Sequence, residues 1–243
     1  MKKAVLLAAA LICGWAAPVR ADFDHSAFNK VLSTYVHHGQ VDYVGLKAKG
    51  SAGLDKYLAD LATADPATLK NDDERTAFWV NAYNACSLKA VLEGGNNQNR
   101  AGRHRFFSEL KFNVAKHDMT LDDMENKYMG DLFHQPLVHF GLVCSSVGSP
   151  PLRSEAYTGE NVTKDLEDNA RTFVADPTRV RWDEGHKVLW LSPVFDWYKA
   201  DFTAEKGDSV LGFIREHASA SESLPDGAPD VQYFDYDWSL NGN

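Results

Sequence analysis

Apolar residues recur at intervals of three and four along five stretches of the chain, which is the spacing of a helix with one buried face. These stretches cover residues 28–36, 54–61, 72–93, 162–173 and 209–217. The longest has acidic residues in its first turn and ends at Gly94-Gly95, and both features are typical of helix ends. The motif Thr120-x-x-Asp123 has the spacing of a capping box and predicts one further short helix.

Shorter apolar runs predict strands at residues 41–44, 112–114, 180–182, 187–191 and 231–236, with a hairpin about residues 183–186. Residues 137–143 are apolar on both faces and predict a buried strand that carries His139. Strands and helices do not alternate steadily, which favours an α+β fold over a doubly wound sheet. We therefore predict a single α+β domain, with a mixed or antiparallel sheet packed against several helices that include one long buried helix.

The N-terminus has the pattern of a secretory signal peptide. Lys2 and Lys3 precede an apolar run over residues 4–17, and Val19-Arg20-Ala21 places small residues where a signal peptidase cleaves. The run is too short to span a membrane, and no second apolar run follows it. We predict a signal peptide over residues 1–21, a single domain over residues 22–243, and an exported protein, periplasmic or extracellular, with no integral membrane segment after cleavage.

Cleavage would make the chain strongly acidic. It removes three of the 25 lysines and arginines and none of the 34 acidic residues, so the mature net charge is −12. No cluster of basic residues interrupts this charge, which makes nucleic acid and anionic membranes poor partners. We expect the partner to be a small molecule, a peptide or a component of the cell envelope. The sequence indicates no cofactor.

Two cysteines, Cys86 and Cys144, remain after cleavage, which is too few for a disulfide framework. Whether they pair is left open, although the helical pattern around Cys86 favours a small buried side chain. Histidine and acidic residues are frequent before the His139 run, but none has a recognised ligand spacing, so we predict no metal site. These residues are His104, His117, Asp118, Asp122, Asp123, Glu125 and His134.

Polar residues interrupt the long apolar helix. Glu74 and Asn81 fall on one stripe of the predicted helix, and Asn84 lies within its most apolar part. Buried amides must be hydrogen-bonded, so the asparagines either brace a neighbouring loop or line a pocket, and bracing is the favoured interpretation. We predict that both amides are buried and bonded to the strand or loop around His139.

The loop after the His139 run carries several potential nucleophiles close to a histidine. Cys144 follows His139 by five residues, and Ser149 precedes a pair of prolines. A regular strand would place His139 and Cys144 on opposite faces, so Ser149 ranks above Cys144 as the partner of His139. We predict a catalytic group of His139, Ser149, Cys144 and Glu74, in which Glu74 would orient the imidazole and the backbone N–H groups of residues 147–149 would bind an oxyanion.

Five motifs together resemble the family known as domain of unknown function 547, in its exported bacterial branch. The motifs are Gly39-x-Val41-Asp42-Tyr43, Ala77-Phe78-Trp79-x-Asn81-x-Tyr83-Asn84, the His139–Cys144 run with Pro150-Pro151-Leu152-Arg153, Leu191-Ser192-x-x-Phe195-x-Trp197-Tyr198-x-x-Asp201-Phe202, and Tyr236-Asp237-Trp238-Ser239-Leu240-Asn241. They cover nearly the whole mature chain. Members of the family usually have a cysteine before Pro-Pro-Leu, where this chain has Ser149.

The resemblance implies no settled reaction, so the function follows from the residues. Asn81, Asn84, Arg153 and Tyr198 are the candidate binding residues, because they belong to the shared motifs. The histidine beside a nucleophile-rich loop favours a hydrolase or an acyl-transfer enzyme with a site centred on His139. The serine at position 149 favours the alternative, a catalytically inactive binding or assembly module on the same fold.

Overall fold

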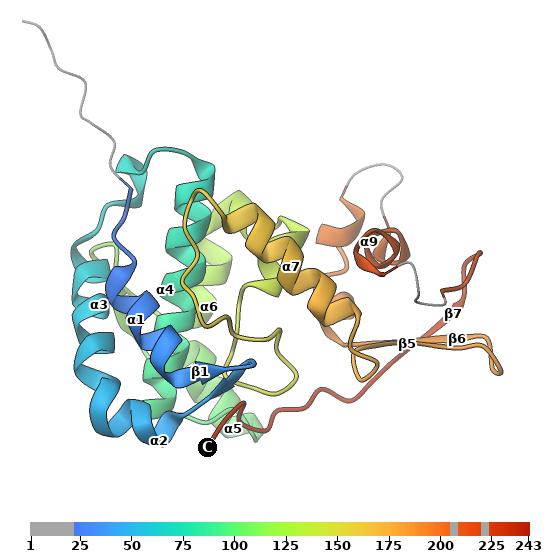
Figure 1. Ribbon diagram of the computed structural model, residues 1–243, viewed down its shortest axis with the longest axis horizontal. Coiled ribbons are helices and arrows are strands. Elements are labelled where there is room, and N and C mark those ends of the chain that lie inside the picture. The colour runs from blue at the N-terminus through green and yellow to red at the C-terminus, as the bar shows by residue number, and fades with distance from the viewer. Residues whose placement is uncertain (1–21, 205–208, 220–223) are drawn as a thin grey trace, which may run out of the picture.

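The computed structural model describes residues 22–204, 209–219 and 224–243 (Figure 1). The predicted signal peptide, residues 1–21, lies outside the described residues. Within the described part, no helix has both the length and the hydropathy needed to cross a membrane.

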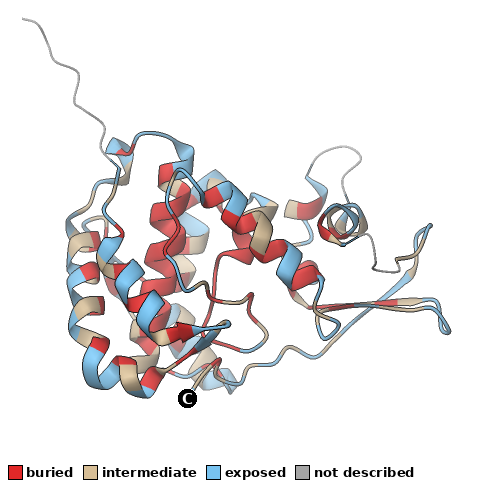
Figure 2. Cartoon of the chain, in the orientation of Figure 1, coloured by how far each residue is buried: buried red, intermediate tan, exposed pale blue. Residues whose placement is uncertain are grey.

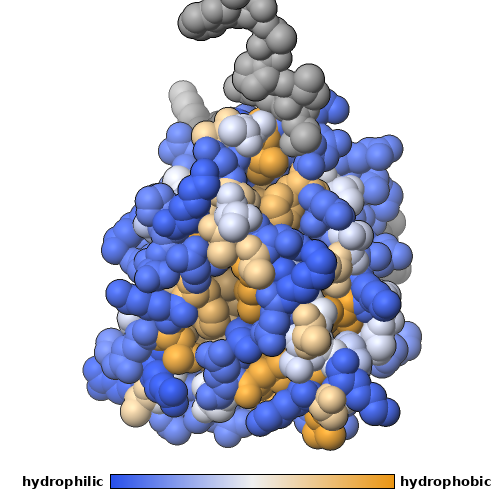
Figure 3. Space-filling model, turned by 90° about the vertical axis from the view of Figure 1, so that its left-hand side faces the viewer, coloured by the Kyte–Doolittle hydropathy of each residue, from blue (hydrophilic) through white to orange (hydrophobic). Residues whose placement is uncertain are grey.

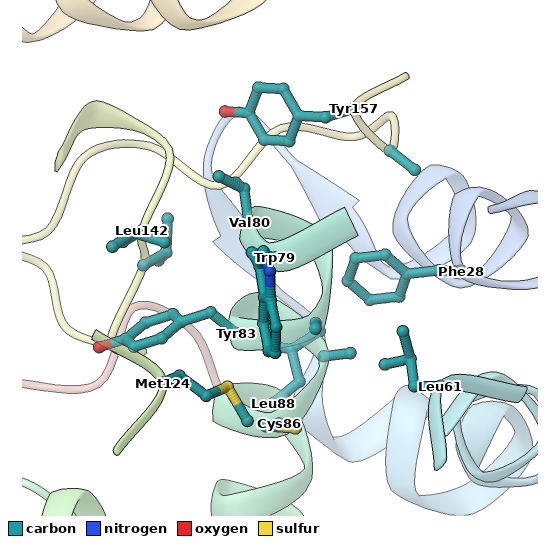
Figure 4. Close-up of a cluster of buried hydrophobic side chains, with 14 of the residues drawn as sticks. Phe28, Leu61, Trp79, Val80, Tyr83, Cys86, Leu88, Met124, Leu142 and Tyr157 are labelled. Carbon is teal, nitrogen blue, oxygen red and sulfur yellow. The ribbon is translucent and has the colours of Figure 1, made fainter. Parts of the chain in front are cut away.

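The centre of the domain is helix α4 (Asp72–Leu92), which is buried along most of its length (Figure 2). The side chain of Asn71 accepts the N–H of Glu74 and so begins the helix, with acidic residues in the first turn. Phe28 and Leu61 pack on one side of α4, while Tyr83 projects from the other side toward Leu142 and Met124 (Figure 4). This confirms the long buried helix that the sequence predicts.

The other helices cover α4 or connect the strands. α3 packs against both α1 and α4, α4 contacts α7, and α7 contacts α9. Their bounds are α1 Ser26–Tyr35, α2 Tyr43–Gly45, α3 Ser51–Thr63, α5 Arg100–His104, α6 Leu121–Asp123, α7 Val162–Val174, α8 Val194–Trp197 and α9 Val210–His217. The capping box at Thr120 is present, with both reciprocal hydrogen bonds formed. Hydrophilic side chains cover most of the face over α1 and α3 (Figure 3).

Several single helical turns complete the chain between these elements. Within the described ranges, three are π-helical: η1 Leu46–Gly50, η3 Arg105–Glu109 and η4 Met124–Tyr128. Four more in the described part of the chain are 3₁₀ turns: η2 Pro66–Thr68, η5 Gly130–Leu132, η6 Pro136–Phe140 and η7 Asp201–Thr203.

Among the residues that the structure describes, the strands form three small sheets. The strands are β1 Val36–His37, β2 Gln40–Val41, β3 Phe112–Val114, β4 His117–Met119, β5 Val180–Asp183, β6 Val188–Leu191 and β7 Asp230–Tyr233. β1 pairs with β2 and β3 with β4, while β6 lies between antiparallel β5 and parallel β7. The predicted α+β class and the 180–191 hairpin are confirmed. Only the start of the strand predicted over residues 41–44 is present, because β2 ends at Val41 and Asp42 caps α2.

The buried strand predicted at His139 is wrong. Residues 136–140 form the 3₁₀ turn η6, with Pro136 in its first turn, and the chain then continues as an extended segment. A side-chain amide takes the place of a neighbouring strand there, because Asn84 accepts the N–H of Val143 and donates to the carbonyl of Gly141. The apolar run is therefore buried without belonging to a sheet.

The C-terminal segment returns from β7 across the domain to β1 and β2 (Figure 1). On its way it pairs with the loop after Cys144, since the N–H groups of Val147 and Gly148 donate to the carbonyls of Ser239 and Asp237. Its end is fixed by the bond from the N–H of Val41 to the carbonyl of Asn241. This path places Tyr236 and Trp238 beside the loop.

Candidate functional site

A cleft of about 270 Å³ opens between α4, the loop after His139, α8 and the C-terminal segment. Aromatic, acidic and hydroxyl-bearing side chains share its lining. These are Tyr83, Phe107, Asp122, Glu125, His139, Leu142, Cys144, Ser149, Pro150, Val194, Trp197, Tyr198, Tyr236 and Trp238. Three of the four predicted catalytic residues, His139, Cys144 and Ser149, therefore meet in one cavity.

One wall of the cleft is a group that we call the thiol cluster: Cys144, Ser146, Ser149 and Tyr236. The Cys144 Sγ lies 3.1 Å from the Oγ of Ser146, 3.1 Å from the Oγ of Ser149 and 3.5 Å from the Tyr236 hydroxyl. The three hydroxyl groups lie 2.9–3.2 Å from one another. Each of these contacts can be donated from either side, so hydrogens can shift among four groups without a change in the fold.

The loop that carries the thiol cluster is held from outside. Arg179 donates to the carbonyls of Val147 and Ser149. Gly148 packs against the Tyr236 ring so closely that a Cβ would lie 2.8 Å from it. The N–H groups of residues 147–149 all donate to backbone carbonyls, of Ser239, Asp237 and Ser146 in turn. The oxyanion site predicted from these N–H groups is therefore wrong, because none of them is free to bind a substrate.

His139 lies at the edge of the cleft in a closed setting. Its Nε2 is 2.8 Å from the Oδ2 of Asp201, and its ring stacks on Tyr198 with the centroids 3.9 Å apart. Its Nδ1 is buried and has no hydrogen-bond partner. Burial lowers the pKa of His139 from 6.5 to about 4, although Asp201 opposes this shift. The imidazole is therefore neutral at neutral pH.

Glu74 does not orient His139, so that predicted pairing is wrong. The Glu74 carboxyl lies against Gly159, at the start of α4, where a Cβ on Gly159 would come within 2.2 Å of its Oε1. The carboxylate beside His139 is Asp201, whose other oxygen is 2.9 Å from the Nδ1 of His134. Asp201 belongs to the Leu191–Phe202 motif, but only the packing of η7 against η6 shows that it is the partner of His139.

Asn81 and Asn84 are both buried, as predicted. Asn84 bonds the segment after His139, at Gly141 and Val143. Asn81 differs from the prediction, because it bonds the N–H and the carbonyl of Tyr157 instead. Both amides hold backbone and are absent from the lining of the cleft.

The two other predicted binding residues, Tyr198 and Arg153, lie in different parts of the structure. Tyr198 lines the cleft and carries the stacked His139 ring. Arg153 points elsewhere, forms an ion pair of 3.0 Å with Asp165, and lies over the ring of Tyr157. Arg153 therefore fixes α7 to the loop before it and does not contribute to the cleft.

Glu125 is a functional candidate that the sequence analysis did not select. Burial raises its pKa from 4.5 to about 7, with the Tyr83 hydroxyl opposing the shift and Asp122 adding to it. A carboxyl group with such a pKa can both accept and release a proton near neutral pH. The signal in the sequence was an acidic residue one helical turn after Asp122, which the acidic surroundings concealed.

The mouth of the cleft is aromatic. The rings of Trp197, Tyr236 and Trp238 lie within 4.4–5.9 Å of one another, and Trp197 is 49% exposed. Phe107 lies against the edge of Trp238. We call Phe107, Trp197, Tyr236 and Trp238 the aromatic rim.

The two described cysteines, Cys86 and Cys144, are both free. Cys86 is completely buried in α4, whereas Cys144 lines the cleft. Across residues 22–204, 209–219 and 224–243, no three histidine, cysteine or acidic side chains are grouped as metal ligands.

The fold and the cleft define an α+β domain in which a free thiol, a buried His–Asp pair and a carboxyl group of raised pKa share one cavity. A family model described as "Protein of unknown function, DUF547" matches residues 66–174, which confirms the resemblance to that family over this part of the chain. The matched stretch contains His139, Cys144 and Ser149, whereas Tyr198, Asp201 and Tyr236 follow it. No curated protein and no solved structure matches the chain.

Proposed function

We propose that the cleft is the active site of a hydrolase or acyl-transfer enzyme in which Cys144 is the nucleophile. The observation that carries this proposal is the thiol cluster, which surrounds a free cysteine with three hydroxyl groups at the wall of a cavity. Hydroxyl groups that donate to sulfur favour the thiolate, which is the reactive form. The same hydroxyls are available to bind the oxyanion of an acyl intermediate.

The structure favours Cys144 over Ser149 as the nucleophile, which reverses the order expected from the sequence. A thiol is intrinsically the better nucleophile at neutral pH. Cys144 is 9% exposed and Ser149 only 2%. The Ser149 Oγ also accepts the N–H of Cys144 and so has a structural task. Ser149 is then a positioning residue and an oxyanion donor.

The reaction would proceed through a thioester. The sulfur of Cys144 attacks the carbonyl carbon of the substrate, and its proton passes to the carboxylate of Glu125 through the substrate or a water in the cleft. Glu125 returns that proton to the leaving group as the carbon–leaving-group bond breaks. Water, or a second nucleophile, then releases the acyl group from sulfur. His139 and Asp201 hold Tyr198 in place and remain outside the proton transfer.

A second candidate function is a binding module without chemistry. The closed setting of His139 favours it, because a base that is neutral, stacked and unpartnered at Nδ1 braces an aromatic wall rather than activates a nucleophile. The two candidates differ in one property. An enzyme requires a reactive Cys144, whereas a binding module requires only the shape of the cleft.

Alkylation and a substrate screen distinguish the two. We expect iodoacetamide to modify Cys144 in the folded protein and to leave Cys86 unmodified, because Cys86 is fully buried and burial raises the pKa of its thiol. A panel of ester, thioester and amide substrates is then assayed with the native protein, with Cys144→Ala and with the matched control Cys86→Ala. Turnover that Cys144→Ala abolishes and Cys86→Ala retains supports the enzyme. An inert panel with an unreactive Cys144 supports the binding module.

We further propose that the protein is exported and cleaved after Ala21. The lysines, the apolar run and the small residues before the cleavage point support this. The intact mass of the protein recovered outside the cytoplasm tests it, since the mature chain would begin at Asp22. Recovery of a chain that still begins at Met1 would overturn the proposal.

A further inference from the structure

We propose that the substrate of this cleft carries an alkylammonium group, such as a lysine side chain, which the aromatic rim and the carboxyl groups of Asp122 and Glu125 bind together. This inference rests on the proposed function in taking the same cleft as the reactive site, and it adds the chemical class of the ligand. It requires no particular reaction at Cys144.

The charges of the cleft favour a cation. Two carboxyl groups, Asp122 and Glu125, belong to its lining, whereas no lysine or arginine occurs among the described residues that line it. They are three residues apart on consecutive helical turns, so they project from one side. Their effect on each other is visible, since Asp122 contributes to the raised pKa of Glu125. An anionic ligand would add to this repulsion, and a cation would relieve it.

Two arginines, Arg103 and Arg179, contact residues or backbone at the cleft, and both already have partners. Arg103 lies with its guanidinium 4.6 Å from the centroid of the Trp238 ring and donates to the carbonyl of Asn97. Arg179 holds the loop carbonyls behind the thiol cluster. Neither side chain belongs to the lining, so neither offers a site for a carboxylate or phosphate group of a ligand.

The aromatic rim supplies the second half of a site for an alkylammonium group. A cation within about 6 Å of a tryptophan or tyrosine face is attracted by the ring quadrupole. The contact of Arg103 shows that the Trp238 ring takes a cation on its face in this molecule. Trp197, which is half exposed, and Tyr236 present further aromatic surface at the mouth. An alkyl chain would pack on these rings while its charged end reaches the carboxyl groups.

The size of the cleft limits the ligand. Its volume of about 270 Å³ is at the lower end of small-molecule sites, so it admits one side chain or one small amine. The alkylammonium group can come from a peptide lysine or from a free diamine. These two sources share the same chemistry, and the test includes one probe for each.

The test is a binding titration with full-length mature Cys144→Ala protein, which cannot form a thioester. The probes are Nα-acetyl-lysine methylamide and cadaverine, with Nα-acetyl-norleucine methylamide as the neutral control and Nα-acetyl-glutamate methylamide as the anionic one. Tryptophan fluorescence and calorimetry report binding. We expect at least one of the two cations to bind about tenfold more tightly than norleucine, and glutamate to bind most weakly. The tighter cation identifies the source.

Matched variants locate the bound cation. Trp197→Ala in the same background is expected to weaken cation binding about three- to tenfold, because an aromatic face is lost. Glu125→Gln is expected to weaken cation binding by about tenfold. Both substitutions are expected to change the affinity for the norleucine probe less than they change the affinity for the cations. Trp182→Ala, in the β5–β6 hairpin and outside the lining of the cleft, is the control and is expected to leave the binding of every probe unchanged.

The outcomes separate this inference from the proposed function. Equal binding of lysine and norleucine probes, tighter binding of glutamate, or no binding of any probe overturns the alkylammonium site, whatever Cys144 does. A cation preference that Trp197→Ala and Glu125→Gln reduce supports it, even where the substrate screen finds no turnover. In that case the cleft is a binding site for amines, and only the proposed enzymatic function is overturned.

Discussion

Two groups of buried polar side chains lie at or near helix α4, and their hydrogen bonds are satisfied in different ways. In the first group, Asn81 and Asn84 each bind the N–H and the carbonyl of backbone outside their own helix. The second group is the thiol cluster, which is satisfied mainly by its own side chains, whose hydrogens can be shared in several arrangements. The asparagines have one hydrogen-bonding arrangement, whereas the thiol cluster has several.

This difference separates structure from chemistry. An amide that holds two backbone groups fixes a chain path and leaves nothing to offer a ligand. Hydroxyl and thiol groups that bond chiefly one another, at the wall of a cavity, can exchange those bonds for bonds to a substrate. The comparison therefore favours a structural role for Asn81 and Asn84, and it supports the functional role proposed for Cys144, Ser146, Ser149 and Tyr236.

The largest expected effect comes from removing the hydrogen bonds of one of the buried asparagines. Asn84→Leu would leave the Val143 N–H and the Gly141 carbonyl unpaired in the core, so we expect the free energy of unfolding to fall by about 3 kcal/mol. Urea denaturation measures the change. Asn161→Leu is the control, because Asn161 is exposed and its side chain does not cap α7. A loss at position 84 no larger than at position 161 would contradict the bracing role.

Next in size is the pH dependence that His139 confers. Its pKa is lowered from 6.5 to about 4 in the folded protein, mainly by burial, so the unfolded chain binds a proton that the folded chain does not. Stability from this group is therefore present above pH 6.5 and is lost as the pH falls from 6.5 toward 4, by about 3 kcal/mol in all.

The measurement compares the unfolding free energy of the native protein and of His139→Gln between pH 4 and pH 8. The difference between the two curves should narrow as the pH falls, because only the native protein loses the contribution of His139. His37→Gln, at an exposed position, controls for the loss of a histidine as such. A constant difference across the range would show that His139 is not held in its neutral form.

Much of the fold follows from the sequence, because periodicity and end signals are local. The helix over residues 72–92, the Thr120 capping box and the hairpin after Val180 all depend on neighbours a few positions away. The His139 run was misread because burial on both sides is also what a sheet strand shows. Only Asn84, more than fifty residues earlier, reveals that a side chain replaces the sheet.

The site was predicted less well than the fold, for the same reason. The loop with Cys144 and Ser149 can be recognised from the sequence, because its cysteine, serines and prolines lie within a few residues of one another. Asp201, Glu125 and Tyr236 join it only through the packing of η7, η4 and the C-terminal segment. The sequence favours Glu74 because it lies on one stripe of the predicted helix with Asn81, but a shared stripe of α4 does not determine which neighbour each residue faces.

A smaller effect tests how tightly the loop is fitted to Tyr236. A methyl group in Gly148→Ala would come within 2.8–2.9 Å of the Tyr236 ring, which must then shift. We expect a loss of stability of about 1–2 kcal/mol and slower alkylation of Cys144, since Tyr236 belongs to its cluster. Gly227→Ala is the control, because nothing lies within 4 Å of a Cβ at that position. Equal alkylation rates in the two variants would show that the position of Tyr236 does not affect the reactivity of Cys144.

The smallest change in stability, and the sharpest test of the cluster, comes from Ser149→Cys. In the reduced protein a thiol replaces a hydroxyl group of similar shape, so we expect a change in unfolding free energy below about 1 kcal/mol. We expect a lower activity than that of the native protein, because a thiol donates more weakly to the oxyanion than a hydroxyl group does. The Ser149 Oγ is 3.1 Å from the Cys144 Sγ, so under oxidising conditions the two sulfur atoms are close enough to form a disulfide after a small rotation. Thiol titration should then lose both groups, and activity should disappear until a reductant restores it. Ser87→Cys is the matched control, because Ser87 is equally buried but bonds Ser145 instead of Cys144. If both variants keep all their thiols after oxidation, the side chains at positions 144 and 149 are not in contact. The thiol cluster would then not exist as described, and its contrast with the asparagines would fail.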